Sequence, residues 1–407
     1  MAPTTITGTV FAPNASLALY GADVYVPLSP PEPFQDGVQC TQCTDTLPGG
    51  ALVHAISDES GQFTLANVPA GANVPLVIAI GKWRRSIVLP AVAACSTTVL
   101  PPSTTALPRS RSEGELPRIA IGTGQFDALE CLVRKLGVAD SEFGAVGSPA
   151  RVHLYANDGG LSPLNQMHVG TGATSSTAGD TFSATSALWN DLDALAAYDI
   201  VMLGCEGFEF PETKPQAAMD AMKAFADRGG RVFLSHFQNV WLAGDEADPA
   251  HAPAVWRDVA TCNGNTDELG SYTGVIDEVD NPIGGAFAHW MTNVFASSVP
   301  GQFPITWGTT AKHTCSAVDT ARAERWVSMS AAGQEFPQTF QFTTPLEAEP
   351  NARCGRVVFS DMHVSADSQS SPAKPFPTGC ASSPLTPQEK ALAFMFFGIA
   401  SCVGPVL

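Results

Sequence analysis

The chain has 407 residues, which is enough for two or three domains with a hydrophobic core each. It carries 21 Lys and Arg residues against 39 Asp and Glu residues, so its formal net charge is -18. Nucleic acids and anionic membrane surfaces are bound by clusters of Lys and Arg, and this charge therefore argues against both as partners. No apolar stretch approaches the roughly 20 residues that a membrane-spanning helix needs.

The ten cysteines form an even number, and only Cys40 and Cys43 have C-x-x-C spacing. A zinc ribbon needs a second such pair, so the spacing gives little support to a four-cysteine zinc site. Few lysines and many Gly and Pro residues favour a disulfide-containing protein that is secreted, periplasmic or on the cell surface. The chain enters a strand-like run almost at once, so we expect a mature form whose signal segment has been removed. Neither the disulfide pairing nor the oligomeric state follows from the sequence.

Residues 1–100 are expected to form an all-β domain. Residues 22–26 alternate apolar and polar side chains, as half-buried strands do. Gly61 and Gly71 lie in turn-like segments between further short apolar runs. Short strands at this spacing predict a β-sandwich.

The same region contains, in this order, the segments "ITGTV", "GADVYV", "DESGQFTLANVPAG" and "VPLVIAIG". They resemble the carboxypeptidase regulatory-like (prealbumin-like) domain. The resemblance implies a β-sandwich accessory module, structurally related to starch-binding-type domains. The chain departs from the family pattern in a long insertion, residues 27–52, which contains Cys40 and Cys43.

Residues 101–116 are rich in Ser, Thr, Pro and charged residues, and we expect them to link the first domain to a second one at residues 117–407. In the second domain, Asp127 followed by Glu130 is the expected start of a helix. Capping boxes are expected at residues 213–216 and 386–389.

Strand and helix patterns alternate along this second domain. Such alternation predicts an α/β fold with a flavodoxin-like, doubly wound parallel sheet. Residues 245–350 lack the alternation, and we expect them to form a long loop-rich insertion.

Three segments of the second domain, "YDIVMLGCEG", "AFADRGGRVFLSHF" and "CGRVVFSDMH", resemble the class I glutamine amidotransferase-like superfamily, and its ThuA-like branch in particular. The resemblance implies a fold, and a fold alone does not give a function. An amidotransferase would have its nucleophile in a G-x-C-x-G motif after the second segment's strand. This chain has Ser235-His236-Phe237 there, so glutaminase activity is not implied.

Polar residues follow three of the predicted strands: Cys205 and Glu206, then His236, then Asp361 and His363. Ligands of open parallel sheets bind beyond the carboxyl ends of the strands, so these residues are the candidate site. One reading makes Cys205 a nucleophile, with His236 or His363 as its base and Asp361 or Glu206 orienting the imidazole. Another has His236 and His363, together with Asp361 and Glu206, hold a divalent metal such as zinc or manganese, with His236, His363 and Asp361 as the first candidates. The structural alternative makes Cys205 a disulfide partner or a small apolar residue, and each histidine a hydrogen-bonded residue under a loop.

Two functions fit these observations. The first is a secreted or cell-surface binding or accessory protein, with a small molecule or a polysaccharide as ligand, as both resemblances loosely imply. The second is an extracellular hydrolase that uses Cys205 or a His236/His363 metal site. A free Cys205 of low pKa, or a bound metal, would favour the enzyme. Cys205 in a disulfide would favour the binding protein.

Overall fold

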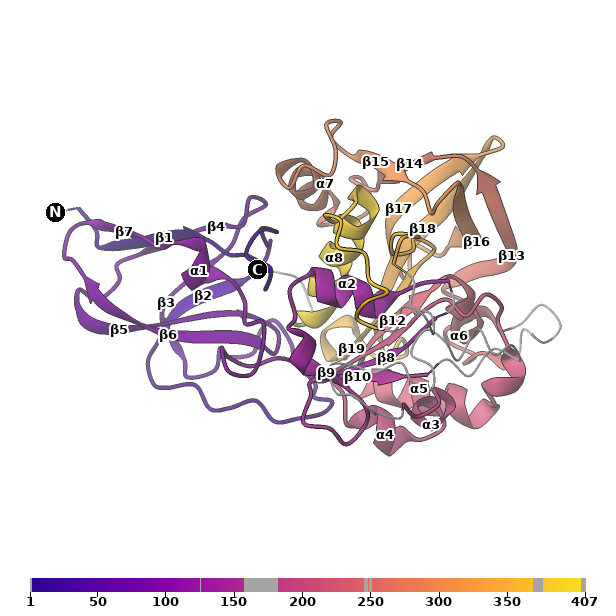
Figure 1. The fold of residues 1–407 in the computed structure, drawn as a ribbon, viewed down its shortest axis with the longest axis horizontal. Helices are drawn as coiled ribbons and strands as arrows, with labels where there is room; N and C mark the ends of the chain where they lie inside the picture. Colours follow the sequence, from indigo (N-terminus) through magenta and orange to yellow (C-terminus); the bar gives the residue numbers. More distant parts are fainter. Residues whose placement is uncertain are drawn as a thin grey trace.

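The computed structural model describes residues 2–124, 126–156, 182–244, 248, 251–368 and 376–403, without the side chains of residues 263–266. The chain has mixed α/β content, with an all-β part at its N-terminus and a larger part that contains most of the helices (Figure 1). Within the described ranges, no helix combines the length and apolarity that crossing a membrane requires.

Two sheets make up the N-terminal part. The three-stranded sheet has the order β4 (Gln62–Ala66), β1 (Thr5–Thr9), β7 (Thr97–Val99). The four-stranded sheet has the order β3 (Ala51–Ile56), β2 (Asp23–Pro27), β5 (Gly71–Ile80), β6 (Trp83–Val92). Val24 in β2 and Leu65 in β4 are fully buried and belong to the same hydrophobic cluster.

The large sheet of the second part has ten strands. Their order is β15 (Gln302–Ile305), β14 (Tyr272–Ile276), β17 (Glu324–Ala331), β18 (Gln334–Thr344), β19 (Gly355–Ser360), β12 (Arg231–Ser235), β11 (Ile200–Leu203), β8 (Ile119–Gly122), β10 (Val152–Tyr155), β9 (Phe143–Gly144). The strands from β19 to β9 are parallel, and β15 to β18 pair antiparallel with one another and with β19. The expected purely parallel sheet is therefore wrong in this respect, because the sheet is mixed. Its parallel core, β10-β8-β11-β12-β19, has the flavodoxin-like strand order.

Helices cover both faces of the parallel core. Ile119 and Ile121 of β8 pack into one hydrophobic cluster with α2 (Leu129–Lys135) and α8 (Pro387–Ala400). Ala120, between them, belongs to a second cluster, with α3 (Ser186–Trp189), α4 (Leu192–Ala196) and α5 (Gln216–Asp227). Successive side chains of a strand point to opposite faces, which is why strands covered on both faces read as continuous apolar runs.

Residues 245–350 are not the loop-rich insertion that we expected. In addition to the four antiparallel strands, they contain α7 (Gly284–Asn293) and the hairpin of β13 (Ala260–Leu269) and β16 (Thr310–Val318). The periodicity is hard to see because β18 contains Pro337, which pairs with Ser328 where the register shifts. Proline lacks the backbone N–H of a sheet ladder and is tolerated at such irregularities.

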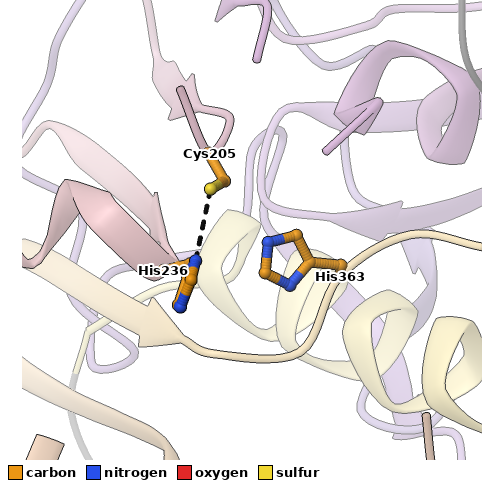
Figure 2. Close-up of side chains that lie close together, drawn as sticks. All are labelled: Cys205, His236 and His363. Atoms are coloured by element: carbon orange, nitrogen blue, oxygen red, sulfur yellow. Dashed lines mark hydrogen bonds between the residues drawn. The ribbon is translucent and has the colours of Figure 1, made fainter. Parts of the chain in front are cut away.

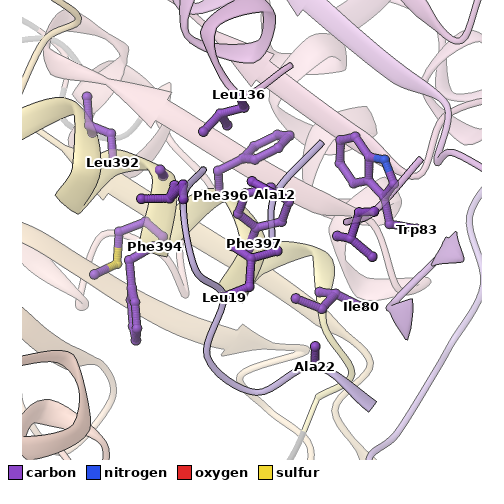
Figure 3. Packing of buried hydrophobic residues seen from close by; sticks show 14 of the residues in the cluster. Ala12, Leu19, Ala22, Ile80, Trp83, Leu136, Leu392, Phe394, Phe396 and Phe397 are labelled. Carbon is purple, nitrogen blue, oxygen red and sulfur yellow. The ribbon is translucent and has the colours of Figure 1, made fainter. Parts of the chain in front are cut away.

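The two parts of the molecule share an apolar interface (Figure 3). Trp83, at the start of β6, packs on Phe396 and Phe397 of α8 with ring centroids 5.6 and 5.7 Å apart. Tyr20 stacks on Phe394 of the same helix at 6.0 Å. Burying aromatic rings of this size gives the interface a substantial hydrophobic contribution.

Residues 101–116, the expected linker, include the short α1 (Pro102–Thr105). They reach the second part through Arg109, which donates to the Gly137 carbonyl oxygen, and Arg111, which pairs with Glu142. The Trp83 indole donates a hydrogen bond to the carbonyl oxygen of Pro108, at 3.1 Å. Arg84 forms an ion pair with Glu115. The segment is therefore part of the packed structure.

Eight of the ten cysteines form four disulfides: Cys40–Cys354, Cys43–Cys402, Cys131–Cys380 and Cys262–Cys315. The C-x-x-C pair thus holds the 27–52 insertion to the α/β part rather than binding zinc. Cys95 is free and exposed, and Cys205 is free and buried. The disulfides are compatible with an extracellular location.

The amino ends of the parallel strands are tied to the end of α8. Arg231, at the start of β12, donates to the carbonyl oxygen of Ser401 at 3.1 Å, and Arg356 of β19 donates to that of Cys402 at 3.1 Å. Arginine side chains commonly bind the last carbonyl groups of a helix in this way. At the other end of α8, Thr386 and Glu389 form the expected capping box, so that prediction is confirmed. The capping box expected at residues 213–216 is wrong, because α5 has Pro215 as its N-cap and Lys214 turns inward.

Candidate functional site

Three of the predicted residues meet at the carboxyl ends of neighbouring parallel strands (Figure 2). Cys205 follows β11, His236 follows β12 and His363 follows β19. Their potential ligand atoms all lie within 4.8 Å of one another, and each residue is at most 2% exposed. The Cys205 Sγ and His236 Nδ1 atoms share a hydrogen bond of 3.3 Å, and the His236 and His363 ring centroids are 4.9 Å apart.

His236 occupies a strained position in the backbone. Its φ is +48°, in the left-handed region, and a short 3-10 turn (His236–Asn239) begins directly at this residue. Residues other than glycine rarely adopt this backbone conformation, which costs them roughly 1–3 kcal/mol. A sharp strand-to-helix turn presents a side chain at the top of the sheet, as in the nucleophile elbow of hydrolases. Here that turn presents the imidazole of His236.

Cys205 is held in a tight crossing of two loops. A Cβ atom on Gly124 would lie 2.3 Å from the carbonyl oxygen of Cys205, so only glycine fits there. The backbone N–H groups of Gly207 and Phe237 form hydrogen bonds with the thiol group, which favours its ionised form. Burial nevertheless dominates and raises the pKa of Cys205 to about 12. With no other ligand at the sulfur, the side chain is a neutral thiol near pH 7.

His363 is held in one orientation and one protonation state. Its Nδ1 atom lies 3.0 Å from the backbone carbonyl oxygen of Asp361, which requires that Nδ1 carry the proton. Burial, and next the positive charge of Lys312, lower the pKa of His363 to about 3, so the ring is neutral. The Nε2 atom is buried and has no hydrogen-bond partner among the described residues. Histidine ligands of metals typically donate one ring N–H to a carbonyl group and leave the other nitrogen for the metal.

The other two predicted residues do not join this group. The carboxylate of Glu206 forms an ion pair with Lys214, at 2.7 Å, and both side chains are buried. The carboxylate of Asp361 accepts hydrogen bonds from the backbone N–H and the hydroxyl group of Thr314 in β16, both at 2.9 Å. Burial raises the pKa of Asp361 to about 7. Asp361 thus contributes its carbonyl oxygen to the site, through His363, and its side chain holds the β13–β16 hairpin.

Asp127 was expected to cap a helix, and this expectation is wrong. Helix α2 has Ala128 as its N-cap and no side-chain cap. The Asp127 carboxylate instead accepts hydrogen bonds from Ser235 and Val364, the neighbours of the two histidines. Burial raises the pKa of Asp127 to about 7. Its sequence signature is the same as that of an N-cap, so sequence reasoning had no means of separating the two roles.

Aromatic rings surround the cluster. Phe237 lies next to His236, with centroids 4.4 Å apart, and stacks on the exposed Phe208. Trp307 lies 5.8 Å from His363 and touches Phe126. A cavity of about 1280 Å³ lies elsewhere, at the amino ends of the strands, and the cluster is not part of its wall.

No protein-family model matches the chain. No curated protein matches it either. Similar solved structures include a cohesin–X-dockerin complex from Acetivibrio cellulolyticus, with 15% identity, a TM-score of 0.18, and coverage of 36% of this chain and 78% of that chain. They also include a cytoplasmic protein from Salmonella typhimurium, with 10% identity, a TM-score of 0.34, and coverage of 69% and 96%. The glutaminase domain of CTPS from Trypanosoma brucei with bound acivicin has 13% identity, a TM-score of 0.34, and coverage of 72% and 97%. Likenesses this distant carry no argument about function, which therefore rests on the geometry of the site.

Proposed function

We propose that this protein is an extracellular hydrolase that depends on a divalent metal ion held by Cys205, His236 and His363. The observation that carries the proposal is the convergence of one sulfur and two imidazoles within 4.8 Å, at the edge of the sheet where open α/β folds bind ligands. The unpartnered Nε2 atom of His363 is the second support, because a buried ring nitrogen without a partner is costly unless something binds it.

The residues fit zinc or a similar transition metal. Catalytic zinc sites have three protein ligands of the Cys, His and carboxylate types and keep a fourth position for water, whose pKa the metal lowers to about 7. The neutral His363 is ready to coordinate, since protonated imidazole does not bind metals. A coordinating thiol loses its proton outright, so a raised thiol pKa in the metal-free protein is no obstacle. The N–H groups of Gly207 and Phe237 then stabilise the thiolate.

The alternative with Cys205 as a covalent nucleophile has one favourable observation, the 3.3 Å hydrogen bond to His236. The electrostatics oppose it. Reactive cysteines lie in electropositive, partly exposed surroundings that lower the pKa of the thiol, whereas Cys205 is buried and has a pKa of about 12. The carboxylates of Glu206 and Asp361, which this mechanism needs beside an imidazole, bind Lys214 and Thr314 instead.

The reaction we propose is hydrolysis of an ester or amide bond. Water adds to the carbonyl carbon, the bond to the leaving group breaks, and an acid and an alcohol or amine are released. The aromatic rings of Phe126, Phe208 and Trp307 favour a substrate with an apolar face next to its carbonyl group. In this proposal the N-terminal sheets form a regulatory-like accessory module, and the second part belongs to the amidotransferase-like superfamily without glutaminase activity.

An accessory protein that binds a small molecule or a polysaccharide is the competing function. A disulfide at Cys205 would have favoured this accessory function, and Cys205 is a free cysteine. The test is hydrolysis of p-nitrophenyl esters and p-nitroanilides by zinc-loaded protein, by chelator-treated protein, and by chelator-treated protein with zinc restored. We expect activity that disappears with the chelator and returns with zinc, is lost in His363→Gln and is kept in Cys95→Ser.

Two results would contradict the metal proposal. Activity that survives the chelator and is lost only in Cys205→Ser would indicate the thiol mechanism. Polysaccharide binding without any hydrolysis would indicate the accessory role.

A further inference from the structure

We propose that Asp127 is a positioning residue that fixes the two histidine-bearing turns relative to each other and so sets the geometry of the Cys205/His236/His363 cluster. The inference rests on the proposed function in that it names the support of the same site. It arises from contacts that no sequence motif indicated.

Asp127 lies in the loop that follows β8, and its side chain joins the turn after β12 to the turn after β19. Its Oδ2 atom accepts a hydrogen bond from the Ser235 hydroxyl group at 2.5 Å, and its Oδ1 atom accepts one from the backbone N–H of Val364 at 2.8 Å. Ser235 directly precedes His236, and Val364 directly follows His363. One carboxylate thus joins the ends of β12 and β19 at the two points where their histidines leave the sheet.

The backbone of Asp127 lies against Gly204, the chain neighbour of the third member of the site. A Cβ atom on Gly204 would be 2.8 Å from the carbonyl oxygen of Asp127. Gly204 directly precedes Cys205. Asp127 therefore contacts a chain neighbour of each of the three residues in the cluster, and it contributes no atom to the cluster itself.

The burial of this carboxyl group needs an explanation that helix capping does not supply. Asp127 is 1% exposed, and helix α2 makes no use of its side chain. Burying a carboxyl group is costly unless its oxygens are hydrogen-bonded, and both oxygens of Asp127 accept bonds. Ligand-supporting partners of this kind typically change metal affinity 10–100-fold when they are removed.

Glu130 provides a matched control. It lies three residues further on, is fully buried, and neither of its carboxylate oxygens has a hydrogen-bond partner among the described residues. Glu130 is thus a buried acid close to Asp127 whose carboxyl group does not join two segments of the chain. A variant of Glu130 therefore measures the general effect of changing a buried acid at this place.

The test measures Co²⁺ affinity and the Co²⁺ absorption spectrum, in a Cys95→Ser background that leaves Cys205 as the single free thiol. We expect Asp127→Ala to lower the affinity about 10–100-fold and to alter the spectrum. Asp127→Asn keeps an acceptor for Val364 and a partner for Ser235, so its affinity should stay within about threefold of the native value. Ser235→Ala removes one of the two bonds and should cause an intermediate loss, and it answers the question if Asp127→Ala does not fold. Glu130→Gln should bind like the native protein.

The rate at which Cys205 is alkylated in the folded, metal-free protein is the second readout. We expect it to rise at least about tenfold in Asp127→Ala, because the turns that cover the thiol are no longer joined, and to stay native-like in Asp127→Asn. If the native protein binds no Co²⁺, the proposed function fails, and the alkylation rates still decide the role of Asp127. If Asp127→Ala and Ser235→Ala match the native protein in both readouts, or Glu130→Gln changes as much as they do, the inference about Asp127 is wrong.

Discussion

The two ends of the parallel strands differ in what their polar groups do. At the amino ends, Arg231 and Arg356 donate hydrogen bonds to the carbonyl oxygens of Ser401 and Cys402, directly after α8, and the disulfides Cys40–Cys354 and Cys43–Cys402 hold the 27–52 insertion in place. At the carboxyl ends, His236 has a left-handed backbone, and the Nε2 atom of His363 is buried without a partner in the described structure. The amino ends are built for stability. The carboxyl ends retain strain and an imidazole nitrogen that can accept a ligand, whereas the Nε atom of Arg356 at the amino ends, unpartnered among the described residues, can only donate.

A difference of this kind is expected if the carboxyl ends hold the proposed site. Strain and unpaired buried groups persist in folded proteins mainly where they serve a function, because elsewhere they only reduce stability. The stabilising contacts lie at the opposite ends of the strands from the site. We therefore expect different substitutions to change the stability of the protein and the geometry of the site.

The largest expected effect is at the amino ends. Replacing Cys43 and Cys402 together by serine should lower the free energy of unfolding by about 2–5 kcal/mol, because a long loop is no longer closed in the unfolded chain. Denaturant titration measures the change, and zinc affinity should stay within about twofold of the native value. Zinc affinity that falls with stability would show that the two ends are not independent. Cys95→Ser is the control for removing a cysteine that makes no disulfide.

A substitution at the carboxyl ends should lower zinc affinity much more than it lowers the free energy of unfolding. His363→Gln removes a proposed ligand, and zinc affinity should fall by at least about 100-fold, or about 2.7 kcal/mol, as measured by competition with a chelating dye. His54, a half-exposed histidine that pairs with Asp23 in the N-terminal sheets, is the control, and His54→Gln should bind zinc normally. Equal affinities for His363→Gln and the native protein would remove His363 from the site.

The smallest effect concerns the buried Glu130 and depends on pH. Burial raises the pKa of Glu130 from 4.5 to about 8, so the folded protein binds this proton more tightly than the unfolded chain does. The stability of the native protein should therefore fall as pH rises from about 4.5 to about 8, and this loss should be absent in Glu130→Gln. The difference in unfolding free energy between the variant and the native protein should grow over this pH range in favour of the variant and level off near pH 9. A difference that does not change between pH 4.5 and 9 would show that Glu130 titrates normally.

The sequence predicted which strand ends bring their polar residues together, and it did not predict where each of those side chains points. Cys205, His236 and His363 could be found because each follows an apolar run that reads as a buried parallel strand. The directions of Glu206 and Asp361 could not, because they depend on partners that other segments supply, namely Lys214 and Thr314.

The fold shows the same limit. The parallel core has local patterns of strand and helix, whereas the antiparallel half is interrupted by irregularities such as Pro337. The disulfides join cysteines that are 53 to 359 residues apart, and nothing in their spacing selects these pairs among the many that ten cysteines allow.

The zinc K-edge X-ray absorption spectrum of zinc-loaded protein reports which elements surround the metal and at what distance, so it shows whether Cys205, His236 and His363 bind zinc. We expect one bound zinc with one sulfur at about 2.3 Å and two imidazole nitrogens at about 2.0–2.1 Å, and the loss of the sulfur signal in Cys205→Ser. A spectrum with only oxygen and nitrogen neighbours, or a protein that retains no zinc after dialysis, would contradict the proposed metal site.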